Sequence, residues 1–390
     1  MTSIKDIKAK DVMSEKLQHT TPHEMVSDVI GMMREYDLEE LPVVEDGEVV
    51  GFISDNTFID RRNLSFNTKI KHVMNPAPTV KTDDSLVKAC ELILSSGYRG
   101  VPVTSESGDY EGFISRKDIS RIIPTIDELK KTTVKKHMTP DPETIESDEH
   151  IGKAKSMMER YDVRVLPVVD KYGKPIGMVG IQDILNKATR PIDREEKGNM
   201  SGEINSPQRD IEVQSVMSKP AVTITPNSLI YDAAKKMNEE NVSTLAVTDD
   251  DEIKGVITQF DLIEIITTFR EDTDQVFVQI AGLKGRPEIY DEIYGRIQKY
   301  LGKINKVLDP LVLNVHVVSH QEAGTQSKYS VRLRLSTEYG MYYAKEVNWN
   351  IIEGLNKGLK SLEKRIFQDK EKKLERKRDH KYQAYIHKKR

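Results

Sequence analysis

The sequence has little cysteine, few aromatic residues and no long apolar run. Its single cysteine, Cys90, cannot form an internal disulfide, and it lies in an apolar helical pattern that predicts a small core residue. No stretch approaches the ~18 consecutive apolar residues of a membrane-spanning helix, and the N-terminus has no apolar core of signal-peptide length. These absences predict a soluble, cytoplasmic chain with no membrane partner.

Several catalytic and metal-binding signatures are also missing. There is no phosphate-loop motif, no dinucleotide fingerprint after a first strand, no HExxH and no pair of cysteines. His316 and His320 have no second ligand at metal spacing, so ordinary strand and loop histidines are expected. We find no nucleophile paired with a base. The sequence therefore predicts a protein that is not an enzyme, has no metal site and requires no cofactor.

Charge is divided unevenly along the 390 residues, although the formal net charge is only −4. From Gln275 to the C-terminus there are 24 Lys and Arg against 13 Asp and Glu, a formal charge of +11. Residues 1–274 carry 35 against 50, a formal charge of −15. The acidic N-terminal part and the basic C-terminal part suggest different partners. The basic part suggests nucleic acid or another anionic surface. A solvated helical tail is the alternative.

One sequence pattern occurs four times in the first two thirds of the chain. Each copy opens with a Met, continues through a short strand and an amphipathic helix, and reaches a small apolar strand. A turn, a Gly and a last apolar strand follow, and in three copies an Asp lies six residues after the Gly. The opening residues are Met13, Met74, Met138 and Met217, the closing glycines are Gly51, Gly112, Gly177 and Gly255, and the aspartates are Asp118, Asp183 and Asp261. Such a period predicts one structural unit, repeated.

The four copies resemble CBS domains, which pair two by two into disc-like Bateman modules. We expect them at residues 1–66, 67–130, 131–189 and 213–272, with the polar segment 190–212 as a linker. The family pattern at the closing strand is Gly, two apolar residues, Ser or Thr, two variable residues and Asp. In CBS domains that bind adenosine-containing ligands, the hydroxyl approaches the phosphate and the Asp accepts hydrogen bonds from the ribose hydroxyls.

The copies differ at these two positions. Copy two has Ser115 and Asp118 and copy four has Thr258 and Asp261, so the resemblance implies one good nucleotide site in each pair. Copy one keeps Ser54 but lacks the Asp, and copy three keeps Asp183 but lacks the hydroxyl. The start of a helix suits a phosphate, yet the same spacing is that of a capping box, which needs no ligand.

Arg99 and Arg164 each precede the small apolar strand of their copy. They are candidates to neutralise a phosphate, and a surface salt bridge is the alternative for both. The expected regulatory ligand is an adenine nucleotide, AMP, ADP or ATP.

From Gln275 the order of expected elements changes to β-α-β-β-β-α. Strands are expected at VFVQIAGL, LVLNVHVVS, KYSVRLRLS and MYYAKEV, with helices from Glu288 to Leu308 and from Asn350 onward. The predicted fold class is therefore α+β: four repeats, a domain at 273–368 with two helices on a four-stranded sheet, and a basic helical tail at 369–390. The tail has little apolar face to bury, so we expect it to be frayed or ordered only when bound.

The domain at 273–368 is similar to the ribosome hibernation-promoting factor family in the order and length of its elements and in its basic helices. Those proteins bind in the decoding region of the small ribosomal subunit. With its four CBS-like copies, the whole chain resembles archaeal CBS-containing ribosome hibernation and dimerisation factors. The resemblance implies the small subunit and its rRNA as partners, and a homodimer formed through the CBS modules.

Basic residues occur where RNA binding would need them. Two stripes run along the two helices, two residues lie at the mouth of the first helix, and the alternation in VRLRL points two arginines to the open side of the sheet. The candidate RNA-binding residues are Lys284, Arg286, Arg296, Lys299, Lys303, Arg332, Arg334, Lys357, Lys360, Lys364 and Arg365. A solvated helix face is the alternative for each lysine taken singly.

The sequence thus predicts a ribosome hibernation factor that blocks the path of mRNA and tRNA and senses adenine nucleotides. The alternative is a nucleotide-sensing CBS regulatory protein that acts on another protein or RNA. Which nucleotide binds, in which direction it regulates, and whether subunits are dimerised or only blocked stay open at this stage.

Overall fold

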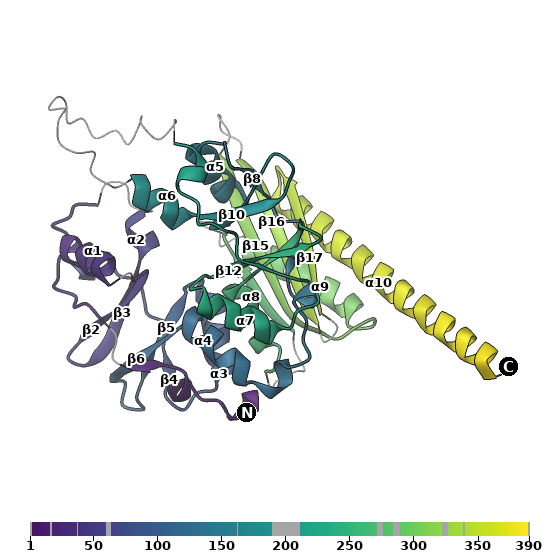
Figure 1. Ribbon diagram of the computed structural model, residues 1–390. Coiled ribbons are helices and arrows are strands. Elements are labelled where there is room, and N and C mark those ends of the chain that lie inside the picture. The colour runs from purple at the N-terminus through teal and green to yellow at the C-terminus, as the bar shows by residue number, and fades with distance from the viewer. Residues whose placement is uncertain are drawn as a thin grey trace. The chain divides into compact units, whose positions relative to one another are not determined.

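The computed structural model describes the backbone of residues 2–15, 18–36, 38–59, 64–161, 163–188, 211–270, 276–283, 289–321, 327–337 and 340–388. Side chains of the last helix are described as far as Glu371. The chain divides into two compact units, and the division cuts through the fourth repeat. One unit contains Met1–Met138, Thr223–Val247 and Val256–Asp272, and the other contains Thr139–Val222, Thr248–Gly255 and Thr273–Arg390. Figure 1 labels the elements.

The first two repeats each contain a helix, an antiparallel hairpin and a closing helix. Repeat one consists of α1 (Val26–Glu35), β2 (Glu40–Glu45), β3 (Glu48–Ser54) and α2 (Asp55–Ile59). Repeat two consists of β4 (Val80–Lys81), α3 (Leu86–Ser96), β5 (Gly100–Thr104), β6 (Tyr110–Ser115) and α4 (Arg116–Ile122). The hydroxyl of Ser85 caps the start of α3, and Gly97 ends it with φ 75°. Cys90 on α3 is fully buried, as predicted.

Repeats three and four have the same order of elements. Repeat three consists of β8 (Ile145–Glu146), α5 (Ile151–Tyr161), β9 (Val165–Val169), β10 (Pro175–Gly180) and α6 (Ile181–Ala188). Repeat four consists of β11 (Thr223–Ile224), α7 (Ile230–Glu239), β12 (Thr244–Asp249), β13 (Glu252–Thr258) and α8 (Gln259–Thr267). In repeats two, three and four the short first strand pairs in parallel with the strand after the helix, because a helical crossover returns the chain in the same direction. The prediction of four repeats is confirmed.

A short 3-10 turn leads each repeat and packs on the other repeat of its pair. The turns are η2 (Ala9–Asp11), η3 (Ile70–His72), η6 (Val134–Lys136) and η8 (Val213–Ser215). Around η2, the amide of Ala9 donates to the carbonyl of Asp84, and the amide of Leu86 donates to the carbonyl of Ile7. The other three turns make the same reciprocal pair of bonds. The leading segment of each repeat is therefore held by its partner repeat.

The Met that opens one repeat contacts the Gly that closes the other repeat of its pair. Met74, at the head of repeat two, lies against Gly51, which closes repeat one; a Cβ on Gly51 would come within 2.5 Å of the Met74 sulfur. Met217 and Gly177 make the same contact, at 2.7 Å. Gly is favoured at these two positions because a methionine of the partner repeat fills the space that a Cβ would need.

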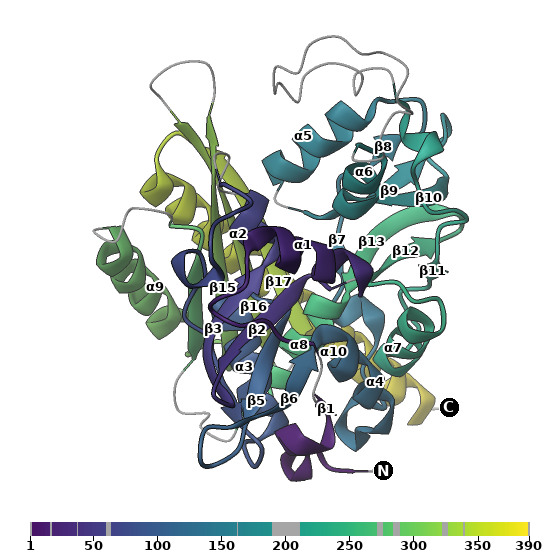
Figure 2. The same cartoon turned by 90° about the vertical axis from the view of Figure 1, so that its left-hand side faces the viewer.

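The C-terminal domain is a four-stranded sheet with the order β14-β15-β16-β17. Its strands are β14 (Phe277–Ala281), β15 (Pro310–Gln321), β16 (Ser327–Thr337) and β17 (Gly340–Asn348). β14 and β15 are parallel because α9 (Tyr290–Ile304) joins them, and the other neighbours are antiparallel. Figure 2 shows α9 beside the sheet. α9 and α10 (Ile351–Lys388) pack on the sheet through a core that includes Ile297, Leu333 and Leu359, so the predicted element order is confirmed.

The helix α10 is 38 residues long and extends past the sheet (Figure 1). It continues without a break from residue 368 into the basic tail, where the sequence predicted a frayed or binding-dependent segment. An α-helix satisfies its own backbone hydrogen bonds, so the tail can remain helical without an apolar face. Gly358 brings α10 close to β16, since a Cβ there would lie 2.6 Å from Leu333 Cδ1.

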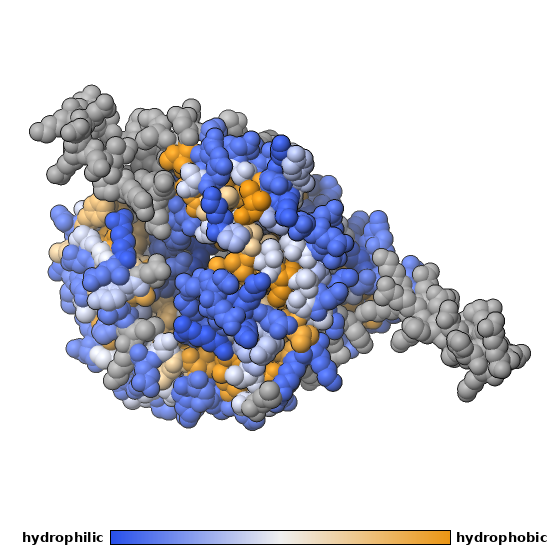
Figure 3. All heavy atoms as spheres, viewed as in Figure 1, coloured by the Kyte–Doolittle hydropathy of each residue, from blue (hydrophilic) through white to orange (hydrophobic). Residues whose placement is uncertain are grey.

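The side chains on the face drawn in Figure 3 are mostly hydrophilic, with smaller groups of apolar residues between them. The short strands β1 (Ser14–Glu15) and β7 (Thr139–Pro140) extend the sheets of the repeats. Within the described part of the chain, no helix is long and apolar enough to cross a membrane.

Candidate functional site

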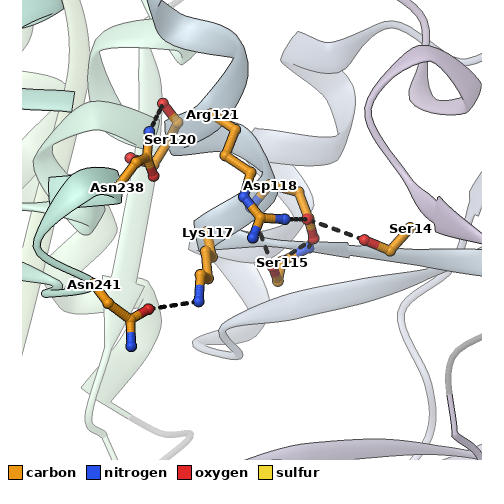
Figure 4. Close-up of polar contacts among 8 residues, drawn as sticks. All are labelled: Ser14, Ser115, Lys117, Asp118, Ser120, Arg121, Asn238 and Asn241. Atoms are coloured by element: carbon orange, nitrogen blue, oxygen red, sulfur yellow. Dashed lines mark hydrogen bonds and ion pairs between the residues drawn. The ribbon is translucent and has the colours of Figure 1, made fainter. Parts of the chain in front are cut away.

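The closing turn of repeat two brings Ser115 and Asp118 together at the junction of β6 and α4 (Figure 4). Ser115 Oγ accepts a hydrogen bond from the amide of Asp118 at 3.2 Å, and Asp118 Oδ2 accepts one from the amide of Ser115 at 2.9 Å. These reciprocal bonds form a capping box. The Ser115 hydroxyl also donates to Asp118 Oδ2 at 2.5 Å. The fold alone therefore explains this spacing.

The Asp118 carboxylate has further partners on its other oxygen. Oδ1 accepts from Ser14 Oγ at 3.1 Å and from Arg121 Nη1 at 3.3 Å (Figure 4). A carboxylate offers about four lone-pair positions, and the chain itself supplies four hydrogen bonds to this one, which is only 8% exposed. A ribose diol would have to replace the bonds from Ser14 and Arg121. Because Ser14 belongs to repeat one, such a ligand would act on the contact between two repeats.

Repeat four has the same closing turn. Asp261 Oδ2 accepts from the amide and the hydroxyl of Thr258 at 2.6 and 2.7 Å, and the amide of Asp261 donates to Thr258 Oγ1 at 3.3 Å. Asp261 is 1% exposed, so it is more deeply buried than Asp118. The two repeats with the full sequence motif therefore share one geometry.

Repeats one and three keep half of this arrangement. In repeat one, Thr57 Oγ1 accepts from the amide of Ser54 at 3.2 Å, so a hydroxyl replaces the missing carboxylate. In repeat three, Asp183 Oδ2 accepts from the amide of Gly180 at 2.7 Å. Burial raises the pKa of Asp183, and the bond from Gly180 opposes that rise. The backbone of Arg164 lies beside Gly180, so the structure brings Arg164 and Asp183 to the same turn.

Arg99 forms an ion pair with Glu39 of repeat one, which matches the salt-bridge alternative. Its backbone amide donates to both carboxylate oxygens of Glu40, at 2.8 and 2.9 Å. Burial raises the pKa of Glu40 to about 7, although the Arg99 amide and the Arg116 guanidinium favour the charged form. Sequence reasoning missed Glu40, because an acidic residue before an apolar strand has no distinctive pattern.

Helices of repeats two and four also meet, and no sequence signal predicted this contact. Lys117 Nζ donates to Asn241 Oδ1 at 2.6 Å, and Asn238 Nδ2 donates to the carbonyl of Ser120 at 3.1 Å (Figure 4). The guanidinium of Arg116 lies 5.3 Å from the ring centre of Phe260. The helices that begin at the two complete motifs, α4 and α8, are therefore neighbours.

The predicted basic stripes of the C-terminal helices are exposed, with one exception. On α9, Lys299 and Lys303 are exposed, whereas Arg296 is half-buried and donates to Glu292 at 2.7 Å and to Asn356 of α10 at 3.4 Å. The predicted cations of α10, which are Lys357, Lys360, Lys364 and Arg365, are all exposed. Lys284 and Arg286 lie outside the described residues.

The second face of the sheet differs from the prediction. Arg332 and Arg334 do point away from the helices, but they are half-buried rather than on an open side. Arg334 Nη1 donates to Thr139 Oγ1 at 3.3 Å, and Lys345 of β17 forms a 3.1 Å ion pair with Glu143. The sequence could not predict that this face is covered, because the covering residues Thr139 and Glu143 belong to repeat three, about 200 positions away in the chain.

Among the residues that the structure describes, no three His, Cys, Asp or Glu side chains are grouped so that they could hold a metal ion.

Two family models match the chain. The CBS-domain model matches residues 9–63, 70–125, 134–189 and 213–268, which together make up more than half of the sequence. The model described as "Hibernation factor Hib, C-terminal domain" matches residues 277–385, which include the sheet, both helices that pack on it and most of the tail.

Curated relatives match over different lengths. The uncharacterised protein MJ1404 of Methanocaldococcus jannaschii is 29% identical over 288 residues, which cover 72% of this chain and 66% of that protein. A homoserine O-acetyltransferase of Methanococcus vannielii is 30% identical over 111 residues, or 28% of this chain and 23% of the enzyme. That partial match involves CBS-domain sequence. The chain thus spans about two thirds of the first relative and about a quarter of the second.

Solved structures show the fold of the repeat region. The crystal structure of MJ1225 from Methanocaldococcus jannaschii has a TM-score of 0.54 at 21% identity and covers 66% of this chain and 99% of that one. An uncharacterised conserved protein of Pyrococcus horikoshii has a TM-score of 0.50 at 22% identity, with 67% and 100% coverage.

Proposed function

The chain belongs to the CBS-domain family, and from that premise we propose that it is a ribosome hibernation factor regulated by adenine nucleotides. The C-terminal domain binds the small ribosomal subunit and its rRNA and blocks the path of mRNA and tRNA. The CBS repeats bind AMP, ADP or ATP, and they form a homodimer that can hold two subunits together.

The exposed cations on α9 and α10 carry the ribosome-binding part of this proposal. Lys299, Lys303, Lys357, Lys360 and Lys364 stand on both helices of a domain that matches the Hib C-terminal model. Exposed lysines contribute little to folding. When they neutralise the phosphates of an RNA, however, they release its condensed counterions, and this release favours binding. Structured RNA is recognised largely through shape and backbone, which suits a rigid pair of helices with cations at fixed spacing.

The nucleotide part is supported by the position of the complete motifs. Ser115 with Asp118 and Thr258 with Asp261 lie at the start of α4 and α8, which contact each other. A nucleotide that replaces the Ser14 bond to Asp118 changes a contact between repeats one and two. Binding energy can shift the arrangement of the repeats only if the ligand prefers one arrangement.

The test is sedimentation of purified archaeal small subunits with the full chain through sucrose gradients, with no nucleotide, with AMP and with ATP. Co-migration with the small subunit supports the proposal, and a heavier peak indicates that two subunits are joined. A difference between the AMP and ATP gradients shows that the repeats regulate binding. If the chain stays at the top of every gradient at low salt, the ribosome is not its partner.

A nucleotide-sensing regulator of another partner gives a different pattern. Isothermal titration then shows AMP or ATP binding that is lost in Asp118→Ala and Asp261→Ala, while every gradient remains negative. The two assays together separate a failure of the ribosomal proposal from a failure of the nucleotide proposal.

A further inference from the structure

The sheet of the C-terminal domain has a second face that is covered rather than open. Strand alternation places Ser330, Arg332, Arg334 and Ser336 on the side away from α9 and α10. Ser330 and Ser336 are buried there, and both arginines are half-buried. In a domain of one sheet and one helical layer, this side would face water.

Repeat three supplies cover from within the same compact unit. Thr139 accepts from Arg334, and Glu143 pairs with Lys345, which is the cross-strand neighbour of Arg332. Lys345 Nζ also lies 3.8 Å from the ring centre of Tyr161, at the end of α5. The contact therefore combines a hydroxyl, a carboxylate and an aromatic ring against a cationic strand pair.

Two of these groups make the kinds of contact that an RNA segment makes. A carboxylate oxygen accepts from Lys as a phosphate oxygen does, and a tyrosine ring meets a cation through its face as a base does. We propose that repeat three docks on this face as an internal substitute for RNA, so that repeat three and RNA compete for Arg334 and Lys345. The inference rests on the proposed RNA-binding function and adds its regulation: the sheet is available only when repeat three leaves.

The contact has the properties of a reversible one. Burial lowers the pKa of Lys345, and the Glu143 carboxylate opposes that shift. The ion pair thus offsets a desolvation cost rather than adding a large net stabilisation. Both Glu143 and Tyr161 remain partly accessible. A polyanion that brings several phosphates at once can replace a single carboxylate.

Two substitutions open the contact without touching the sheet, Glu143→Gln and Tyr161→Ala. The measurement is fluorescence anisotropy of a fluorescein-labelled oligouridylate with the full chain at constant salt. We expect each variant to bind RNA about fivefold more tightly, because affinity rises with the fraction of chains whose site is open. The matched control is Glu146→Gln, which removes the same charge from an exposed position of the same repeat. Equal gains for Glu143→Gln and Glu146→Gln would overturn the proposal, since net charge would then explain both.

A double substitution locates the competition on the sheet. Arg334→Gln alone should change the RNA affinity less than about twofold, because repeat three covers that side chain. In the Glu143→Gln background, the same change should remove the gain. An Arg334→Gln effect that is identical in both backgrounds contradicts the competition.

Hydrogen exchange separates this inference from the proposed function. If repeat three docks on the sheet, Tyr161→Ala should speed the exchange of residues 139–146 in the absence of any RNA, and adding oligouridylate to the native chain should do the same. Wild-type RNA binding with no change of exchange, and no gain in Glu143→Gln, refutes the docking and leaves the function standing. Faster exchange in Tyr161→Ala with no RNA binding by any variant refutes the RNA-binding function and the competition with it.

Discussion

The polar residues that mark the repeats and the cations that mark the C-terminal helices lie in opposite environments. Asp118 and Asp261 are buried and accept hydrogen bonds from their own chain, whereas Lys299 and Lys360 are exposed. A buried carboxylate must be paired because its desolvation is costly, while an exposed lysine needs no partner to be tolerated. Folding therefore accounts for the aspartates but does not require the lysines, which the proposed function assigns to RNA binding.

Removing the more deeply buried of these two aspartates should destabilise the fold strongly. Asp261→Ala leaves the amide and the hydroxyl of Thr258 without their acceptor, and we expect a loss of about 3 kcal/mol in the free energy of unfolding. Urea denaturation measures it. The control is Asp232→Ala, which removes an exposed capping carboxylate from α7 and should cost about 1 kcal/mol. Equal losses would mean that burial of Asp261 has no special weight.

Reversing two exposed cations should leave folding intact and weaken RNA binding. For Lys299→Glu with Lys360→Glu, we expect the affinity for the small subunit to fall about 10²-fold. The slope of log affinity against log salt concentration should become less steep by about two. The melting temperature should not change. The matched control is Lys155→Glu with Lys235→Glu, a double reversal on exposed helix faces of the repeats. If the control weakens binding equally, the helices have no specific role.

Glu40 lies between these two environments: it is half-buried, and the nearby Arg116 guanidinium does not offset the desolvation that raises its pKa. Its pKa is raised to about 7, above the ~4.3 of an unfolded glutamate, so the folded chain holds the proton more tightly. The free energy of unfolding should therefore fall as the pH rises from about 4.5 to 7. Glu40→Gln removes this loss and should be more stable than the native chain above pH 7, by about 2 kcal/mol. Parallel pH profiles of the two proteins would contradict the shift.

Completing the motif in repeat three should give the smallest effect of these four predictions. Gly180→Ser adds the hydroxyl that Asp183 lacks, and we expect a gain of ~0.5 kcal/mol because a serine cap is only slightly better than glycine. The new Cβ would lie 3.3 Å from Asp183 Oδ2, so the carboxylate must shift slightly. Thermal unfolding measures the gain. A loss of stability would show that this turn has no room for the full motif.

Much of the fold and part of the candidate site could be predicted from local patterns. The apolar spacing of Leu86, Cys90 and Ile93 and the alternation in VRLRL depend only on helix and strand periods. The capping box of Ser115 and Asp118 is equally local, since its two residues are three apart. The prediction of an adenine-nucleotide site at these residues stays a prediction.

Contacts between distant segments could not be predicted in the same way. Met74 against Gly51, Glu40 against the Arg99 amide, and the cover on Arg334 each join residues from different repeats or domains. A residue type alone does not specify which of many compatible partners will lie opposite it. The open sheet face was predicted from a single domain and was wrong because a second one packs on it.

The sequence by itself determined the four repeats, the β-α-β-β-β-α domain and the exposed lysines of its helices, because periodicity and charge act over neighbouring residues. Only the tertiary structure decided that Asp118 and Asp261 are buried, that each repeat packs its leading turn on its partner repeat, and that repeat three lies on the cationic face of the sheet. Burial and pairing depend on which surfaces meet, and that is a property of the folded chain as a whole.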